Sequence, residues 1–217
     1  MTQTTMMKTH LIRGRAMVRY TYICNEILKL YRAVKEVEFP IDPLWFFQVI
    51  ENCRVMTYQE MAAINGSAVS DIITLCESSS GCTHYSMAAD RYLTLYNASH
   101  DGNNVEGRIR WTKAHELGHV ALNHLQHIAV PHVAENNFNS VSDPELEKEA
   151  DYFAANLLSP FPAFQVFNIH TLSDIQIAFG LSEEAAKNRM AQYIEWRNGH
   201  RKTAWENDIR KLLLKNN

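Results

Sequence analysis

His115-Glu116-Leu117-Gly118-His119 is the stretch from which the fold of this chain can be worked out. Two histidines four positions apart lie on one face of a helix, so both imidazoles can reach a single metal ion. The glutamate that follows the first histidine projects beside that ion, where it can take a proton from water. We therefore predict a metal helix over about 106–126, with His115 and His119 as ligands and Glu116 as a general base.

A metal site of this kind needs a third protein ligand, with water in the fourth position. One known solution is a third histidine six residues after the second, but Leu125 occupies that position here. His124 is one residue out of register, about 100° around an ideal helix from the required place. These residues argue against a third histidine ligand on the same helix.

The other solution is a glutamate on a later helix, followed four residues on by an acid that orients a ligand histidine. Glu147 and Asp151 have this spacing, which places them on one helical face. We predict Glu147 as the third ligand and Asp151 as the acceptor for the distal N–H of one ligand histidine. Glu149 is the alternative ligand, although it points about 160° away from Asp151.

The start of this second helix is marked by local signals. Asp143 is a suitable N-cap and Pro144 then occupies the first turn, so the helix is expected to run from there to about residue 158. Acids near its N-terminus are also favourable through the helix dipole alone. Gly118 costs the metal helix about 1 kcal/mol relative to alanine. Close packing of the second helix at this glycine would explain why it is there.

Two segments around these residues resemble the ImmA/IrrE family of metallo-endopeptidases. Residues 110–119 match its Arg-aromatic-Thr-x-Ala-His-Glu-Leu-Gly-His pattern. Residues 147–160 match its Glu-x-x-Ala-Asn/Asp-x-Phe-Ala-x-x-Leu-Leu-Met-Pro pattern, with Ser159 in place of Met, and residues 179–186 are similar to its C-terminal Phe-Gly-Val-Ser-x-x-Ala segment. The resemblance implies a cytoplasmic bacterial or prophage peptidase that cuts a helix-turn-helix repressor, which releases stress-response or mobile-element genes.

The composition agrees with an ordinary globular protein. The 217 residues are 46% hydrophobic and 21% charged, and the net charge of −3 gives no reason to expect general binding to nucleic acid or membranes. No apolar run approaches the length needed to span a bilayer. The four cysteines contain no Cys-x-x-Cys pair and suit buried thiols in a reducing compartment, so we expect a cytoplasmic protein. These cysteines are Cys24, Cys53, Cys76 and Cys82.

The patterns around the metal helix predict an α+β fold that is mainly helical. Residues 1–20 contain four basic residues and no acid, and we expect a basic flexible tail there. A zincin-like metallopeptidase domain would follow at 21–165. Its first part is expected to form helices at 22–37, 42–53 and 67–76 and strands at 54–61, 83–87 and 91–97. The last two strands would make a small antiparallel sheet packed on the metal helix.

Residues 166–217 are expected to form a C-terminal helical subdomain that resembles a helix-turn-helix. Helices at 172–179 and 182–197 would meet at Gly180, and the basic residues after 199 would fray or continue an amphipathic helix. DNA binding is therefore a rival function. Glu183 and Glu184 argue against it, because they would face phosphates with negative charge. Packing on the peptidase domain or docking of the repressor is favoured instead.

We therefore predict zinc-dependent peptide hydrolysis, with one Zn²⁺ per chain on His115, His119 and Glu147. Glu116 would take a proton from water and pass it to the leaving amine. A DNA- or repressor-binding regulatory protein, with a structural or sensory metal site and no proteolysis, is the alternative. The donor that would stabilise the oxyanion stays open. The candidates are His124, His127, His132, His170, Tyr152 and Tyr85.

Overall fold

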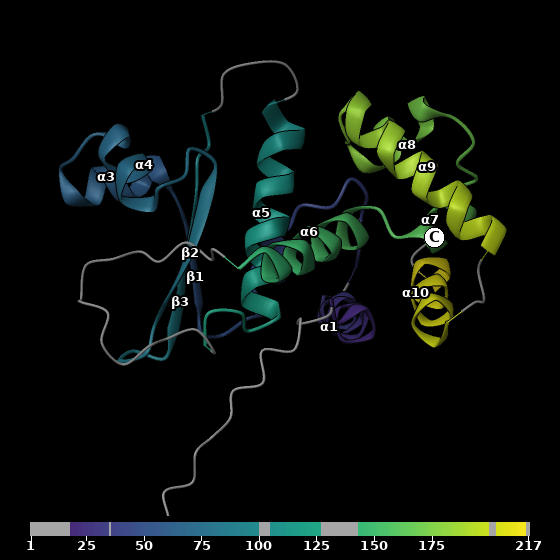
Figure 1. Cartoon of the computed structure of the whole chain (residues 1–217), viewed down its shortest axis with the longest axis horizontal. Helices are drawn as coiled ribbons and strands as arrows, with labels where there is room; N and C mark the ends of the chain where they lie inside the picture. Colours follow the sequence, from purple (N-terminus) through teal and green to yellow (C-terminus); the bar gives the residue numbers. More distant parts are fainter. Residues whose placement is uncertain (1–17, 35, 100–104, 127–142, 200–202, 216–217) are drawn as a thin grey trace, which may run out of the picture.

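Two crossing helices, α5 (Val105–Ala121) and α6 (Pro144–Leu158), form the centre of the computed structural model (Figure 1). A three-stranded sheet with two short helices lies on one side of this pair, and the C-terminal helices lie on the other. The structure describes residues 18–34, 36–99, 105–126, 143–199 and 203–215. This arrangement confirms the prediction of a mainly helical α+β fold. None of the described helices is both long and apolar enough to cross a membrane.

The sheet consists of β1 (Cys53–Thr57), β2 (Gly81–Ser86) and β3 (Arg91–Tyr96), in the order β1-β3-β2. β2 and β3 form the predicted antiparallel pair, in which Thr83 lies opposite Thr94. β1 pairs with β3 in parallel, so a third strand that was not assigned to this pair extends it into a mixed sheet. Two helices follow β1, and a connection of this length allows parallel pairing.

Only the first part of the predicted strand 54–61 is extended. Thr57 ends β1 and caps α3 (Tyr58–Asn65) through a capping box with Glu60, which starts a helix at a point where a strand was predicted. α4 (Val69–Cys76) follows as predicted. α3, α4 and the sheet enclose a second, smaller core around Tyr58 and Leu95.

α1 (Tyr20–Ala33) buries its apolar face in the main core, and the Tyr31 hydroxyl donates a 2.6 Å hydrogen bond to the Leu157 carbonyl. This helix confirms the one predicted at 22–37, and it begins at the last residue of the region that we assigned to a tail. Residues 1–17 of that region lie outside the described residues. The predicted helix 42–53 is reduced to the single turn α2 (Leu44–Phe47), after which the chain forms turns.

Four helices follow α6: α7 (Phe161–Val166), α8 (Leu172–Phe179), α9 (Glu183–Gly199) and α10 (Ala204–Lys215). α8 and α9 confirm the predicted pair, and Gly180 takes a left-handed conformation at φ +62° between them. No helix was predicted directly after residue 158, so α7 is an addition to the predicted elements. Pro160 is the N-cap of α7 and Pro162 lies in its first turn, where a missing N–H costs little. α10 forms where fraying was one expectation.

Arg189 joins α9 to the end of α6. Its guanidinium is buried, donates to the Ser159 carbonyl and to the Asn156 amide oxygen, and lies 3.8 Å from the centre of the Phe161 ring. Burial lowers the pKa of Arg189 to about 9. The negative end of the α6 dipole compensates part of this charge. The C-terminal helices are therefore held against the same helix that presents Glu147.

Candidate metal centre

Gly118 is the point where α6 comes closest to α5. A Cβ atom at Gly118 would lie 3.2 Å from the Ala150 Cα and 3.2 Å from the Phe153 Cδ1. These contacts are too short for a side chain without displacement of the α6 backbone. The prediction about this glycine is therefore confirmed, and the close crossing brings Glu147 over the face of α5 that carries the histidines.

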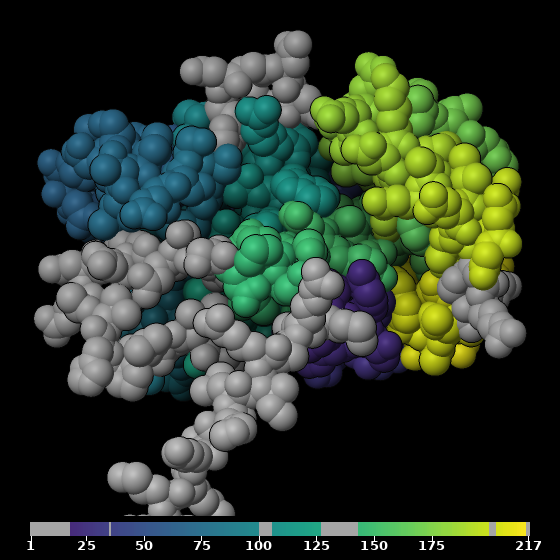
Figure 2. All heavy atoms as spheres, viewed as in Figure 1, coloured from purple at the N-terminus to yellow at the C-terminus, as the bar shows by residue number. Residues whose placement is uncertain are grey.

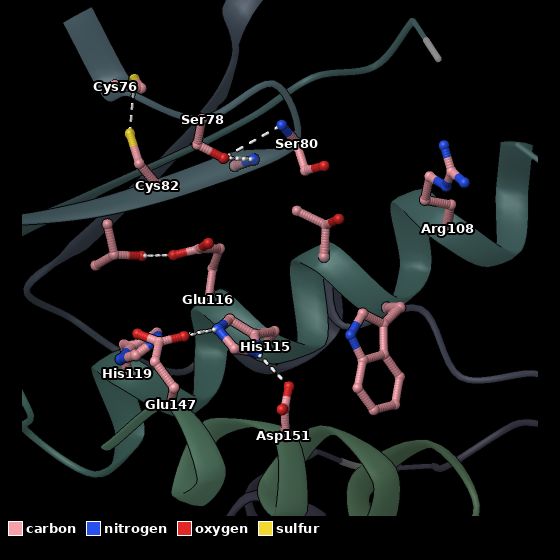
Figure 3. A pocket seen from close by; sticks show the side chains of 14 residues that line it. Cys76, Ser78, Ser80, Cys82, Arg108, His115, Glu116, His119, Glu147 and Asp151 are labelled. Carbon is pink, nitrogen blue, oxygen red and sulfur yellow. Dashed lines mark hydrogen bonds and ion pairs between the residues drawn. The ribbon is translucent and has the colours of Figure 1, made fainter. Parts of the chain in front are cut away.

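His115, His119 and Glu147 point toward one another across this crossing (Figure 3). The two Nε2 atoms are 3.0 Å apart, and the Glu147 carboxylate lies 3.1 Å from Nε2 of His115 and 3.6 Å from Nε2 of His119. Ligand atoms around a tetrahedral zinc ion, at bond lengths of about 2.0–2.1 Å, are separated by about 3.3 Å. The three side chains could therefore hold one metal ion.

The direction of the hydrogen bond to Asp151 supports a cation at this place. A carboxylate only accepts, so the Nδ1–H of His115 donates to the Asp151 Oδ1 at 3.0 Å. In a neutral His115, the lone pair of Nε2 then faces a carboxylate and a second imidazole nitrogen. Burial lowers the pKa of His115, but Asp151 and Glu147 outweigh it and raise the pKa to about 10. The Nε2 lone pair of His115 repels the Glu147 carboxylate, and either a proton on Nε2 or a metal ion between the two groups removes this repulsion.

Glu116 extends from α5 away from α6, toward β2, beside His115 (Figure 3). Its side chain is buried, and the Thr83 hydroxyl donates a 2.7 Å hydrogen bond to its Oε2. Burial raises the pKa of Glu116 to about 7, against the lowering effects of His115 and Thr83. β2 can approach α5 this closely because Gly81 has no side chain; a Cβ there would lie 2.6 Å from the Thr112 Cγ2. Thr83 was not singled out from the sequence, because nothing local connects it to Glu116.

The end of α5 differs from the prediction and changes the role of His124. The helix stops at Ala121 instead of continuing to about 126, and Asn123 adopts a left-handed conformation at φ 56°. The backbone N–H of His124 then donates to the His119 carbonyl, which is the Schellman arrangement of a helix end. The turn places the His124 Nδ1 3.0 Å from the His119 Nδ1. The predicted position of His124 assumed a continuous helix. In the structure His124 still lies outside the ligand cluster, which consists of His115, His119 and Glu147.

Glu149, the alternative ligand, is buried and turned away from the cluster. Its carboxylate contacts the His124 Nε2 at 3.1 Å and forms an ion pair with Arg19. The geometry therefore favours Glu147 as the ligand on α6, as the sequence predicted.

A cavity of about 420 Å³ opens over the ligand cluster and Glu116. It is lined by α5, by α6 and by the segment 78–83, including the edge strand β2. Figure 2 shows the exposed surface of α6 in green between α3 and α4 in blue and the C-terminal helices in yellow. Arg108 and Trp111 also line the cavity and were not among the donors considered from the sequence.

The donors proposed from the sequence lie elsewhere or outside the described residues. His124 contacts the far side of His119, and the Tyr152 hydroxyl lies 3.9 Å from the Cys24 sulfur. The Tyr85 hydroxyl donates to Asp90, and His170 contacts Asn168. His127 and His132 fall outside the described residues. All four cysteines are free thiols, but only three are buried as expected, because Cys53 is half-buried. Cys76 and Cys82 line the cavity with their sulfur atoms 2.7 Å apart.

A helix carrying two histidines, a crossing helix carrying a glutamate, and a buried acid in one open cleft form the kind of site that metallopeptidases use. Residues 100–191 match the family model described as Peptidase_M78, IrrE N-terminal-like domain. The matched residues include α5 to α8 and about half of α9, and the match supports the resemblance of this part of the chain to the IrrE-like metallopeptidases. No curated protein matches the chain.

Proposed function

We propose that this chain is a zinc-dependent endopeptidase. The observation that carries the proposal is that three potential ligands and a buried carboxylate open into the same cleft. Two imidazoles and a carboxylate are a ligand set that suits zinc, with a position left for water or substrate. We expect one Zn²⁺ per chain.

A bound zinc ion would act as a Lewis acid and lower the pKa of a water molecule to about 7. The side chains of this protein would perform the remaining steps. Asp151 holds the ring of His115 through its Nδ1–H. Thr83 donates to the Oε2 of Glu116, so we expect Oε1 to take the proton from water and later deliver it to the leaving amine. Arg108, which lines the same cavity, is our candidate for a second oxyanion donor.

An extended polypeptide is the substrate that this cleft fits best. Within the described residues β2 pairs only with β3, so it is the edge strand of the described sheet, and its first residues line the cavity. An edge strand can bind an extended peptide through its free backbone N–H and C=O groups. By resemblance to the family, we propose a helix-turn-helix repressor in the cytoplasm as the substrate.

Cleavage of purified helix-turn-helix repressors by the zinc-loaded chain tests this proposal. We expect the wild type to cut at least one of them and Glu116→Gln to bind zinc without cutting. Equal cleavage by both proteins would refute the assigned role of Glu116. Zinc-loaded protein that cuts no repressor would instead favour a regulatory protein without proteolysis.

DNA binding remains the second candidate function, because α8, Gly180 and α9 follow each other as in a helix-turn-helix. Several features disfavour it. α9 begins with Glu183 and Glu184, and Lys187 pairs with Glu183. One face of α9 is also buried through Arg189. DNA retention that falls steeply with salt would support this candidate, and no retention at low salt would end it.

A further inference from the structure

His119 is held from behind by a chain of hydrogen bonds, of which the first two are buried. Its Nδ1 lies 3.0 Å from the Nδ1 of His124, whose Nε2 lies 3.1 Å from the Oε2 of Glu149. Arg19 completes the chain: its Nη2 donates to Oε2 at 2.6 Å, and its backbone N–H donates to Oε1 at 2.7 Å. His124 is 1% exposed and Glu149 is 3% exposed, so both are shielded from water.

The chemistry of these groups sets the direction of each hydrogen bond. The guanidinium of Arg19 can only donate, and the Glu149 carboxylate can only accept. The Nε2 of His124 must then carry a proton and donate to Glu149. In the neutral form of His124, Nδ1 is left as an acceptor, so the Nδ1–H of His119 donates to it. That tautomer leaves the lone pair of the His119 Nε2 directed at His115 and Glu147.

We propose that His124, Glu149 and Arg19 act as positioning residues that fix the tautomer and ring orientation of His119 for metal binding. The inference rests on the metal site of the proposed function. It extends that site to Arg19, which lies at the N-cap of α1 and is a hundred residues earlier in the sequence. Partners behind a metal ligand typically change metal affinity about 10–100-fold when they are removed.

The two ligand histidines are held in different ways. His115 is held by Asp151, whose side chain is exposed, whereas His119 is held through a buried imidazole and a buried carboxylate. A buried carboxylate is costly without a charged partner, and Arg19 supplies that partner. Because Arg19 meets Glu149 with both its backbone and its side chain, the start of α1 is tied to the orientation of His119.

Zinc affinity of the full-length chain, measured by chelator competition, tests the role of His124. His124→Phe fills the space without an acceptor, and we expect it to weaken zinc binding about 10–100-fold. His124→Asn keeps an amide oxygen that can accept from the His119 Nδ1–H, so we expect it to recover most of the affinity. His170→Phe is the matched control, because His170 is exposed and contacts Asn168 instead. Equal losses in His124→Phe and His124→Asn would overturn the inference.

A double-mutant cycle tests whether Arg19 acts through His124. We expect Arg19→Met to weaken zinc binding in the wild type and to have no further effect in the His124→Phe background. Additive losses would show that Arg19 supports the fold independently and would overturn its role. In the zinc-loaded wild type, ¹⁵N NMR should show the proton on the Nδ1 of His119, with a hydrogen-bonded shift that His124→Phe removes. A proton on Nε2 would also overturn the inference.

Zinc binding, and not cleavage, is the readout. A protein that binds zinc as expected in all these variants but cuts no repressor would leave the positioning role standing while the proposed peptidase activity fails. If Glu147→Ala binds zinc as tightly as the wild type, the assignment of the metal site is refuted, and the positioning role is refuted with it.

Discussion

At the scale of single residues, each ligand histidine is held through the ring nitrogen that does not face the ligand cluster. Asp151 holds the Nδ1 of His115, and His124 holds the Nδ1 of His119. Both Nε2 lone pairs can therefore point at the same place. Glu116 is buried against β2 in the wall of the same cavity, where the Thr83 hydroxyl offsets part of the cost of removing a carboxylate from water.

Glu147→Ala tests the ligand assignment. We expect bound zinc to fall well below one ion per chain, because two imidazoles alone leave the site incomplete. Zinc content after dialysis, measured by mass spectrometry, gives the result. Glu145→Ala is the control: Glu145 lies on the same first turn but pairs with Lys148. A full complement of zinc in Glu147→Ala would contradict the assignment.

Thr83→Val tests the support of Glu116. The substitution removes the hydroxyl that donates to this carboxylate while it keeps the volume of the side chain. A hydrogen bond to a charged group contributes about 1.5–3 kcal/mol, so we expect kcat/KM to fall about 10–100-fold with unchanged zinc content. Thr83→Ser keeps the hydroxyl and should retain most of the activity. Activity of Thr83→Val equal to that of Thr83→Ser would rule out this role.

At the scale of elements, the crossing of α5 and α6 decides whether the site exists. The crossing is close because Gly118 has no side chain, and it brings Glu147 over the histidines. The start of α6 is defined by Asp143, whose side chain accepts from the Glu145 N–H, and by Pro144 in the first turn. A shift of α6 along its axis would remove Glu147 from the site even if every local signal were unchanged.

Gly118→Ala tests this crossing. Alanine gains about 1 kcal/mol of helix propensity, but overpacking against a backbone typically costs about 1–3 kcal/mol. Because the Ala150 backbone cannot rotate away, we expect the cost to prevail, with a lower unfolding free energy in urea and weaker zinc binding. Gly199→Ala in α9 is the control, since its Cβ would meet nothing within 4 Å. Zinc affinity in Gly118→Ala equal to that of the wild type would argue against the crossing.

At the scale of the molecule, α6 lies between the sheet and the C-terminal helices. Its apolar residues belong to one core that extends from Ile23 in α1 to Leu213 in α10. This core continues across residue 165, where we predicted the boundary between two domains; that boundary stays a prediction. We therefore expect any binding that stabilises the ligand cluster to stabilise the fold of the whole main core.

Zinc removal should consequently lower the stability of the entire chain. A ligand that binds only the folded state adds about 2.7 kcal/mol at a free concentration of 100 times its Kd. We expect a chelator to lower the unfolding free energy of the wild type by an amount of this order and to leave Glu147→Ala nearly unchanged. Urea unfolding followed by circular dichroism measures both. An equal effect of the chelator on both proteins would mean that the metal stabilises another site.

Most of the candidate site could be predicted from the sequence because its signals are local. The four-residue spacing of His115 and His119 and the N-cap at Asp143 act within one or two helical turns. The same is true of Glu147 and Asp151, whose common face follows from helix geometry. Helix formation at these places needs no knowledge of distant residues, so the two helices were correctly predicted, and the structure brings the three proposed ligands together.

The tertiary structure alone decided the partners of these residues. Thr83 meets Glu116 because β2 is the edge of the sheet, and Arg19 meets Glu149 because α1 packs against α6. His124 reaches His119 because Asn123 reverses the chain at the end of α5, which no helical periodicity predicts. The sequence by itself determined which residues could bind a metal, since that depends on spacing within helices. Contacts between distant elements decided how those residues are oriented, because they depend on how the helices and strands pack.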